Sequence, residues 1–326
     1  MLTFGPVPSR RLGRSLGINN IPPKICSYAC VYCQLGKTYQ MKIIPQTFYL
    51  PGQLYEQVQE RVKRSREREE HIDYLTFVPD GEPTLDINLG EEIKLVKSLG
   101  IKVAVISNGS LLDQRKVMEN LLEADLVSLK VDSVDEDVWK KINRPHKKLN
   151  LNTILNNMLK FGSVFKGKII TETMLVKGVN DGIEHMERVA EFIAQLNTEK
   201  VYLSIPIRPP ARRWVQAPQE EVINRCYNIF KKSISQVEYL IGYEGNAFDF
   251  TGEVAKDILS ITSVHPMREE AMRDFLKKTG SDWTIIHKLI EEGRLVETEY
   301  EGKKFYIRKL KPFSLNNFIH TSTISG

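Results

Sequence analysis

The sequence predicts an α/β protein with a parallel sheet that curls into a barrel or part-barrel, followed by a small helical unit. Between Ser15 and about Leu240, short β-branched and apolar runs alternate with amphipathic stretches, which is typical of β-α units. Right-handed crossovers curl such a sheet. After Gly252 this alternation stops. The 326 residues are enough for one full core and a second unit.

Six strands and six helices are expected in the sheet region, giving a (β/α)6 unit. The strands are predicted at residues 15–20, 73–79, 102–108, 126–132, 168–176 and 201–209. Apolar residues recur at helical spacing in the intervening stretches. The helices are therefore predicted at residues 54–68, 89–99, 115–122, 151–161, 184–196 and 220–233.

The C-terminal part resembles a winged helix-turn-helix in the order of its elements. Three short helices are expected at residues 254–262, 268–279 and 282–292, and two strands at 294–300 and 303–309. Asp282 is a plausible N-cap of the third helix and Gly293 its C-terminal stop. We expect a part-barrel domain over residues 1–250, a winged-helix-like domain over 251–312, and a poorly ordered tail over 313–326, where no periodicity remains.

Charge and hydropathy narrow the class of protein. No apolar run approaches the roughly 18 to 20 residues needed to cross a bilayer, and Arg10, Arg11 and Arg14 interrupt the first twenty residues. We therefore expect a soluble, cytoplasmic protein with no membrane partner. The formal net charge of +5 leaves the partner open.

Three of the four cysteines, Cys26, Cys30 and Cys33, fall within eight residues. In a chain with no secretion signal, such crowding indicates metal ligation or redox chemistry rather than disulfides. Structural zinc needs four protein ligands, and no fourth is nearby, because the six histidines are scattered and Cys226 lies far away in a helical pattern. Thiolates also hold iron–sulfur clusters, and three of them leave one iron open for a small ligand.

The spacing Cys26-x3-Cys30-x2-Cys33, on the loop after the first predicted strand, resembles the signature of the radical S-adenosylmethionine (SAM) superfamily. The resemblance implies that these cysteines hold a 4Fe-4S cluster whose free iron is chelated by SAM. It also implies that Tyr32 contacts the adenine. An electron from a low-potential donor, similar to flavodoxin or ferredoxin, would then split SAM into methionine and a 5'-deoxyadenosyl radical that abstracts hydrogen from substrate.

The second predicted strand ends in Asp80-Gly81-Glu82, which resembles the Gly-Gly-Glu motif that binds the methionyl ammonium in this superfamily, with Asp80 in place of the first glycine. Gly81 permits a close turn, and Glu82 can accept hydrogen bonds from a cationic amine. By the same resemblance, Ser107 and Asn108 at the end of the third strand would lie near the ribose.

The fourth predicted strand carries Ser128, Lys130 and Asp132 at alternate positions, so these side chains are expected on one face. Lys130 and Asp132 are candidates to contact the SAM carboxylate or sugar, or else form a buried pair with a structural role. Thr173 on the fifth strand is a further candidate of the same kind. Cys226 is interpreted as a core residue of an amphipathic helix.

Residues 4–13 and the cysteine loop look most like a group related to the wyosine-synthesis enzymes that modify transfer RNA and, more distantly, to the nitrogenase-cofactor maturase. This similarity spans roughly residues 4–250. The wyosine enzymes carry a second cluster on extra amino-terminal cysteines, and none precedes Cys26. Their pyruvate chemistry is therefore not transferred.

Three functions remain open from the sequence. Arg10, Arg11 and the basic residues of 208–213 favour a radical enzyme that acts on RNA or a nucleotide-like substrate. A second possibility is a peptide or protein substrate docked by the C-terminal domain, because acidic residues outnumber basic ones over residues 282–304. The third is a cluster-bearing sensor that binds DNA, although such a protein would need neither Glu82 nor Tyr32.

Overall fold

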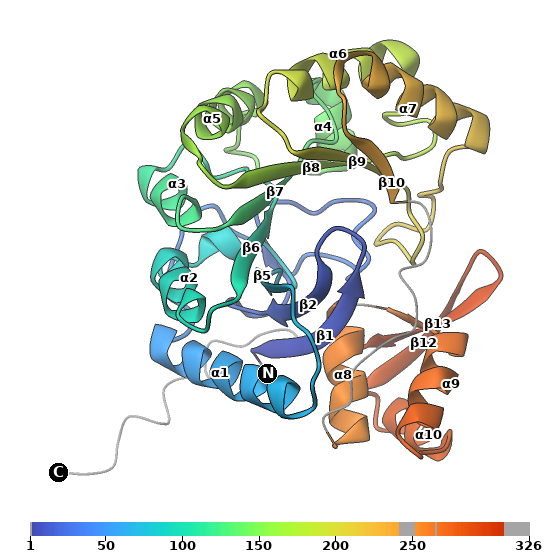
Figure 1. Ribbon diagram of the computed structural model, residues 1–326. Coiled ribbons are helices and arrows are strands. Elements are labelled where there is room, and N and C mark those ends of the chain that lie inside the picture. The colour runs from blue at the N-terminus through green and yellow to red at the C-terminus, as the bar shows by residue number, and fades with distance from the viewer. Residues whose placement is uncertain (1, 241–251, 265, 310–326) are drawn as a thin grey trace.

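The computed structural model describes residues 2–240, 252–264 and 266–309 (Figure 1). Its main sheet has the strand order β1-β2-β5-β6-β7-β8-β9-β10, in which β1 is antiparallel to β2 and the other neighbours are parallel. The strands are β1 Thr3–Ser9, β2 Gly13–Ile18, β5 Tyr74–Phe77, β6 Lys102–Ser107, β7 Leu126–Lys130, β8 Lys168–Met174, β9 Lys200–Ser204 and β10 Val237–Leu240.

Helices cover the outer face of this curved sheet (Figure 1). They are α1 Pro51–Glu67, α2 Leu89–Lys97, α3 Arg115–Leu121, α4 Glu136–Ile142, α5 Leu151–Val164, α6 Ile183–Ala194 and α7 Glu220–Ser233. Their apolar faces pack on outward-facing strand residues: Leu54 and Val58 of α1 belong to one cluster with Leu75 and Phe77 of β5, all fully buried. Burial of each such side chain contributes about 1.5–3 kcal/mol.

All six predicted strands are present, as β2 and β5 to β9, and so are the six predicted helices. The parallel part-barrel is thus confirmed. Among the strands of the main sheet and the helices that cover it, β1, β10 and α4 were not predicted. β1 contains Pro6 and Pro8, which weaken a strand pattern, and β10 has only four residues. Helix α4 has only seven residues. The sequence feature that marks its start is the N-cap Asp135, whose carboxylate accepts hydrogen bonds from the backbone N–H groups of Asp137 and Val138.

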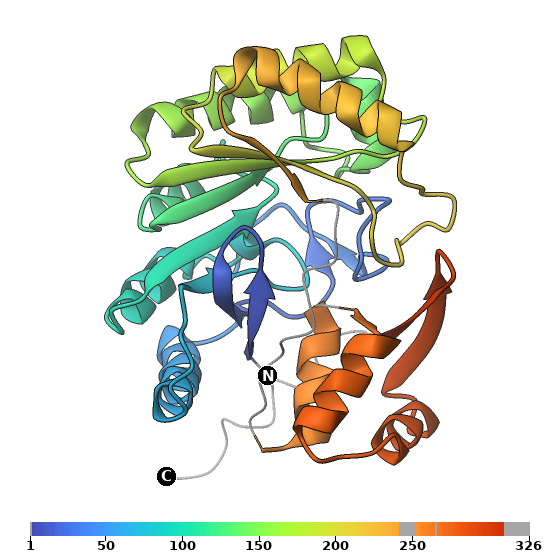
Figure 2. The same cartoon turned by 45° about the vertical axis from the view of Figure 1, so that its right-hand side comes forward.

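The inside of the curve changes from apolar to polar along the strands. Leu12, in the tight turn of the β1–β2 hairpin at the centre of Figure 2, packs against inward-facing residues near the start of the strands. These are Ala104, Leu126, Ile170 and Tyr202, and the same cluster includes Leu240 at the end of β10. Two residues further along, the same strands present Ser128, Glu172 and Ser204, because side chains alternate with a period of two. The carboxyl ends of the strands are therefore the polar end of the interior.

The C-terminal part contains the three predicted helices and the predicted hairpin. Its elements are α8 Val254–Val264, β11 Met267–Arg268, α9 Glu269–Lys278, α10 Thr284–Glu291, β12 Leu295–Tyr300 and β13 Lys303–Arg308, with the sheet order β11-β13-β12. The predicted N-cap was wrong: Trp283 precedes the helix, and the Asp282 carboxylate accepts a hydrogen bond from the Thr284 N–H at 2.8 Å. Gly293 ends the helix as predicted, with a φ of 62°.

This C-terminal part packs against the start of the chain. Phe4 and Val7 of β1 share an apolar cluster with Ile258 of α8 and Met272 of α9, and Tyr300 donates a hydrogen bond to the Pro206 carbonyl at 3.2 Å. The predicted boundary between residues 250 and 251 and the predicted tail over 313–326 lie outside the described residues. Among the helices of the described ranges, none combines the length and the apolar character needed to span a membrane.

Candidate functional site

A cavity of about 300 Å³ opens at the carboxyl ends of β5 to β9. The thiols of Cys26, Cys30 and Cys33 line it together, as their spacing predicts. The loop that carries them is fixed by backbone hydrogen bonds, because Val31 N–H donates to the Ile142 carbonyl at 2.9 Å and Lys24 N–H donates to the Asp80 carbonyl at 2.6 Å. The three thiols are thus held at one wall of the cavity.

Two of the sulfurs accept hydrogen bonds from side-chain amides. Asn108 Nδ2 lies 3.8 Å from the sulfur of Cys26, and Asn143 Nδ2 lies 3.5 Å from that of Cys30. Burial raises the pKa of the Cys26 thiol, and burial with the nearby Asp132 carboxylate raises that of Cys30 to about 12. Thiols in this setting ionise only beside a positive centre, so the donor set fits a thiolate-bound metal group.

One thiolate binds each liganded iron in an iron–sulfur cluster. Among the side chains that the structure describes, no three of the types His, Cys, Asp and Glu are grouped as ligands of a single metal ion. The thiols of Cys26, Cys30 and Cys33 line one cavity together.

Lys24 is a site residue that the sequence analysis missed. It precedes Cys26 by two residues, has a left-handed backbone with a φ of 65°, and is only 5% exposed. Its side chain lines the cavity, and within the described residues its Nζ has no hydrogen-bond partner. Burial lowers the pKa of this amine, while Cys33 and Asp80 oppose that effect. The local feature that marks Lys24 as unusual is its positive φ, and a backbone angle of this kind cannot be read from the sequence.

The turn Asp80-Gly81-Glu82 lies against the cysteine loop and lines the cavity. A β-carbon on Gly81 would collide with the carbonyl oxygen of Ile25, so the close turn predicted for this glycine is present. Asp80 is buried, and burial raises the pKa of its carboxyl to about 7 against the opposing charges of Lys24 and Arg308.

Glu82 is also buried, and its carboxylate accepts hydrogen bonds from residues at the carboxyl end of β6. The donors are Ser107 Oγ at 2.7 Å and the Asn108 N–H at 2.8 Å, while Thr84 Oγ1 donates at 2.7 Å. Burial raises the pKa of Glu82, and these hydrogen bonds oppose the rise. The predicted residues Glu82, Ser107 and Asn108 are therefore parts of one hydrogen-bonded unit.

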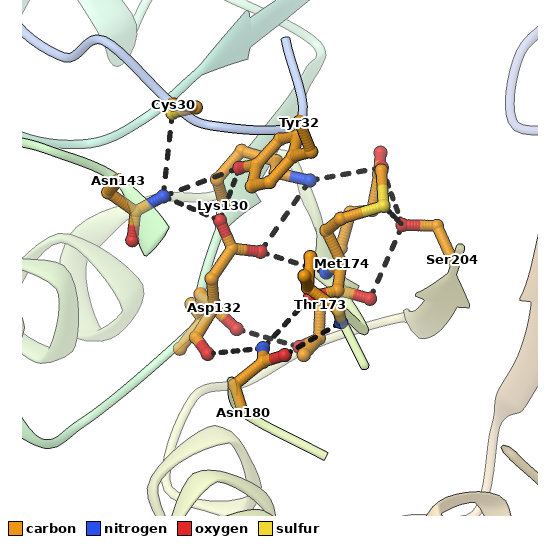
Figure 3. A network of polar contacts seen from close by, with 12 residues as sticks. Cys30, Tyr32, Lys130, Asp132, Asn143, Thr173, Met174, Asn180 and Ser204 are labelled. Atoms are coloured by element: carbon orange, nitrogen blue, oxygen red, sulfur yellow. Dashed lines mark hydrogen bonds and ion pairs between the residues drawn. The ribbon is translucent and has the colours of Figure 1, made fainter. Parts of the chain in front are cut away.

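A second network joins the cysteine loop to β7 (Figure 3). The Tyr32 hydroxyl donates to the Asp132 carboxylate, which also accepts from Asn143 Nδ2 at 2.7 Å and from the Met174 N–H at 2.8 Å. Lys130 Nζ lies 5.0 Å from the centre of the Tyr32 ring, a cation–π distance. Tyr32 and Lys130 line the cavity, whereas Asp132 does not, and both oxygens of its carboxylate accept hydrogen bonds from the protein.

The floor of the cavity holds an ion-pair cluster that sequence reasoning did not find. Glu172 pairs with Arg11 and, at 3.0 Å, with Lys130 Nζ, and it accepts a hydrogen bond from Ser204 Oγ at 2.9 Å. Burial alone would raise the pKa of Glu172, but Arg11 and Lys130 lower it to about 2. Lys130 Nζ lies 3.7 Å from Asp132 Oδ1. The predicted ion pair of these two residues is therefore present, as part of a larger cluster.

Thr173 was predicted as a site residue, and the structure places it elsewhere. Its hydroxyl donates to the Val131 carbonyl at 2.7 Å, and its side chain is fully buried away from the cavity lining. Alternation along β8 turns Glu172 and Met174 inward and Thr173 outward. The prediction therefore named the right strand but a residue on its outward-facing side. Cys226, by contrast, is buried in the helix core as interpreted.

Fold and site together define an enzyme-like part-barrel with thiol ligands at the carboxyl ends of its strands. Residues 20–193 match the model of the Radical SAM superfamily, and the chain belongs to this superfamily. It is 48% identical over 312 residues to the UPF0026 protein MJ1312 of Methanocaldococcus jannaschii, covering 95% of this chain and 97% of that protein. It is 25% identical over 309 residues to an S-adenosylmethionine-dependent nucleotide dehydratase of Flammeovirga pacifica, covering 89% and 96%.

Solved structures share the fold. A radical SAM methyltransferase from Sphaerobacter thermophilus superposes with a TM-score of 0.54 at 16% identity, covering 70% of this chain and 66% of that one. The structure of TYW1 with a lysine-pyruvate adduct bound gives 0.52 at 20% identity, covering 67% and 73%. The chain is an enzyme of the radical SAM class, and this class implies SAM and an iron–sulfur cluster.

Proposed function

We propose that Cys26, Cys30 and Cys33 hold a 4Fe-4S cluster in this cavity. The arrangement of three buried thiols on one wall, two of them hydrogen-bonded by the amides of Asn108 and Asn143, supports the assignment. With SAM bound, such a cluster supplies the electron that cleaves it to methionine and a 5'-deoxyadenosyl radical. The chain's own residues orient the reactants and keep water from the reacting carbon.

We propose that SAM lies along the strand ends, where six of the eight predicted contact residues line the cavity: Tyr32, Gly81, Glu82, Ser107, Asn108 and Lys130. The ring of Tyr32 faces the adenine, and its orientation is held by Asp132 and Asn143. The turn of Gly81 and Glu82 takes the methionyl ammonium, because the buried Glu82 carboxyl group lines the cavity and can accept hydrogen bonds from an amine. Additional contacts to ribose and carboxylate come from Ser107, Asn108 and Lys130. Thr173 has no part in this binding, since it does not reach the cavity.

We propose that the substrate is RNA or a nucleotide-like molecule. The observation that carries this proposal is that the adjacent Arg10 and Arg11 and the distant Arg208 line the same cavity as the thiols. Phosphate groups are recognised by such arginines. The relative named as a nucleotide dehydratase acts, by its name, on substrates of this chemical class.

The test is retention of transfer RNA, and of nucleoside triphosphates, by the purified protein. We expect retention that weakens steeply with salt and that Arg10→Ala reduces at least about fivefold. The control is Arg115→Ala on the exposed face of α3, which should leave the retention of both ligands unchanged. Absent or salt-independent retention would count against a phosphate-bearing substrate.

A second candidate is a peptide or protein substrate docked by the C-terminal part. We propose that this part is a winged helix-turn-helix domain over residues 251–312, that residues 1–250 form the barrel domain, and that residues 313–326 form a tail. The contact of Tyr300 with Pro206 favours it, because Pro206 lines the cavity and the hairpin therefore borders the entrance. Glu299 and Glu301 make this hairpin tip acidic. Crosslinking at Glu301→Cys that traps a peptide, rather than RNA, would support this candidate.

A further inference from the structure

The cluster-bearing end of the chain has no carboxylate side chains. Before Glu56 the sequence contains no Asp or Glu, while it contains six basic residues. These are Arg10, Arg11, Arg14, Lys24, Lys37 and Lys42. Lys24 is buried and Arg11 is paired with Glu172, so the exposed charge of this segment next to the cysteine loop is that of Lys37. A positive surface of this kind attracts negatively charged partners.

One stretch of this segment separates the cavity from the outside. Leu35, Gly36 and Thr38 line the cavity, whereas the neighbouring Lys37 and Tyr39 are exposed. The wall next to the cysteine loop is thus a single chain segment thick. A molecule bound to its outer face would be separated from the cavity by this one chain segment.

The small sheet of β3 (Ile25–Cys26) and β4 (Gln40–Met41) ties this wall to the first cysteine. The two strands are parallel, Met41 is the register partner of Cys26, and the Lys42 N–H donates to the Cys26 carbonyl at 3.1 Å. The backbone from one thiol ligand to the outer face is therefore a continuous hydrogen-bonded path.

The outer face of this wall is apolar as well as basic. Tyr39 is 48% exposed, Met41 38% and Ile44 75%. Three large exposed apolar side chains within six residues are a feature of interaction sites, whereas isolated ones are common on any surface. A few apolar side chains with an adjoining lysine match the small interfaces of transient electron-transfer complexes.

We propose that the outer face formed by Lys37, Tyr39, Met41 and Ile44 is the docking surface for an acidic electron-carrier protein. This inference rests on the proposed cluster at the three thiols. The carrier, a reduced flavin or iron–sulfur protein, is oxidised by one electron and the cluster gains that electron, with no bond made or broken. The acid-free segment attracts the carrier, and the apolar side chains form the contact.

The experiment compares two reductants on the full-length, cluster-reconstituted protein. Release of 5'-deoxyadenosine from SAM is measured with reduced flavodoxin and, separately, with dithionite, which is small and needs no docking surface. We expect Lys37→Glu to lower the flavodoxin-driven rate about tenfold at low salt and to leave the dithionite-driven rate unchanged. Lys232→Glu, an equal charge reversal on exposed α7, should leave both rates unchanged.

Iron content is measured on every variant before the rates. If Lys37→Glu assembles less cluster, Lys37→Gln removes the charge with a smaller perturbation and decides the question. Equal flavodoxin-driven rates in wild type and Lys37 variants would overturn the docking surface. So would a loss of transfer RNA retention with no change in the flavodoxin rate, since the surface would then bind substrate. No release even from wild type with dithionite would instead refute the proposed function.

Discussion

The carbonyl oxygen of Ile25 occupies the space that a β-carbon on Gly81 would need. The same carbonyl accepts a hydrogen bond from the Glu82 N–H at 3.1 Å. The residue before the first cysteine and the turn after β5 are therefore packed backbone to backbone. This contact sets the position of the cysteine loop relative to the strand ends.

Gly81→Ala should separate these two backbones. We expect a loss of about 1–3 kcal/mol in the free energy of unfolding, because a buried backbone must shift to admit the methyl group, and a lower iron content after reconstitution. Gly52→Ala is the control, since nothing lies within 4 Å of its β-carbon position in α1. That change should be neutral or stabilising. Equal iron contents in the two variants would show that the close contact does not position the loop.

Glu172 should stabilise the protein in a pH-dependent way. Arg11 and Lys130 overcome the effect of burial and lower its pKa from 4.5 to about 2. A lowered folded pKa gives stability that is present above pH 4.5 and lost as the pH falls toward 2. Glu172→Gln should therefore cost about 3 kcal/mol at pH 7 and flatten the acid limb of a stability-against-pH curve.

The matched control is Glu199→Gln, which breaks the exposed pair of Glu199 with Lys168. Such surface pairs contribute about 0–1 kcal/mol. Denaturant unfolding of both variants at pH 7 and at pH 3 distinguishes the two cases. If both lose the same amount, the cluster on the cavity floor has no special stability.

Asp86 and Glu92 should give the opposite pH dependence. Both carboxyl groups are fully buried next to one another, and burial raises the pKa of each. A raised folded pKa favours the protonated form, so stability falls as the pH rises above the usual value of Glu92 near 4.5. Glu92→Gln mimics the protonated carboxyl and should be more stable than wild type at pH 8. Thermal melts between pH 5 and 9, with the exposed Glu91→Gln as control, test this; a wild-type melting temperature that rises with pH over this range would contradict it.

Lys24 should raise the reduction potential of the proposed cluster, because its buried amine lines the same cavity as the thiols and its protonated form stabilises an added electron. Lys24→Gln should shift the midpoint potential to a more negative value. Lys24→Arg keeps the charge and should restore it toward wild type. A redox titration followed by electron paramagnetic resonance measures the shift. Equal potentials in all three proteins would mean that Lys24 has only a structural role.

Local patterns explain why part of this fold and site was predictable. The cysteines lie within one loop, Glu82 and Asn108 follow from the resemblance of their motifs to those of the superfamily, and Lys130 follows from alternation along its strand. Contacts between distant segments have no such signal. Arg11 and Glu172 are 161 residues apart, and only the hairpin folding into the barrel brings them together.

Errors at the strand ends have a physical cause as well. Thr173 was chosen in place of its inward-facing neighbour, because a shift of one residue exchanges the two faces of a strand. Asp132 follows the end of β7 at Lys130. Its carboxylate lies 3.7 Å from Lys130 Nζ, as the predicted pair requires, and it also contacts Tyr32 and Asn143, which sequence alternation does not reveal.

The central claim is tested most directly by anaerobic reconstitution of wild type, Cys30→Ala and Cys226→Ala, followed by reduction and addition of SAM. Wild type and Cys226→Ala should bind iron and release 5'-deoxyadenosine, whereas Cys30→Ala should release none. Persistent release from Cys30→Ala, or a wild-type protein that takes up zinc alone, would contradict the assignment of the cluster to these three thiols.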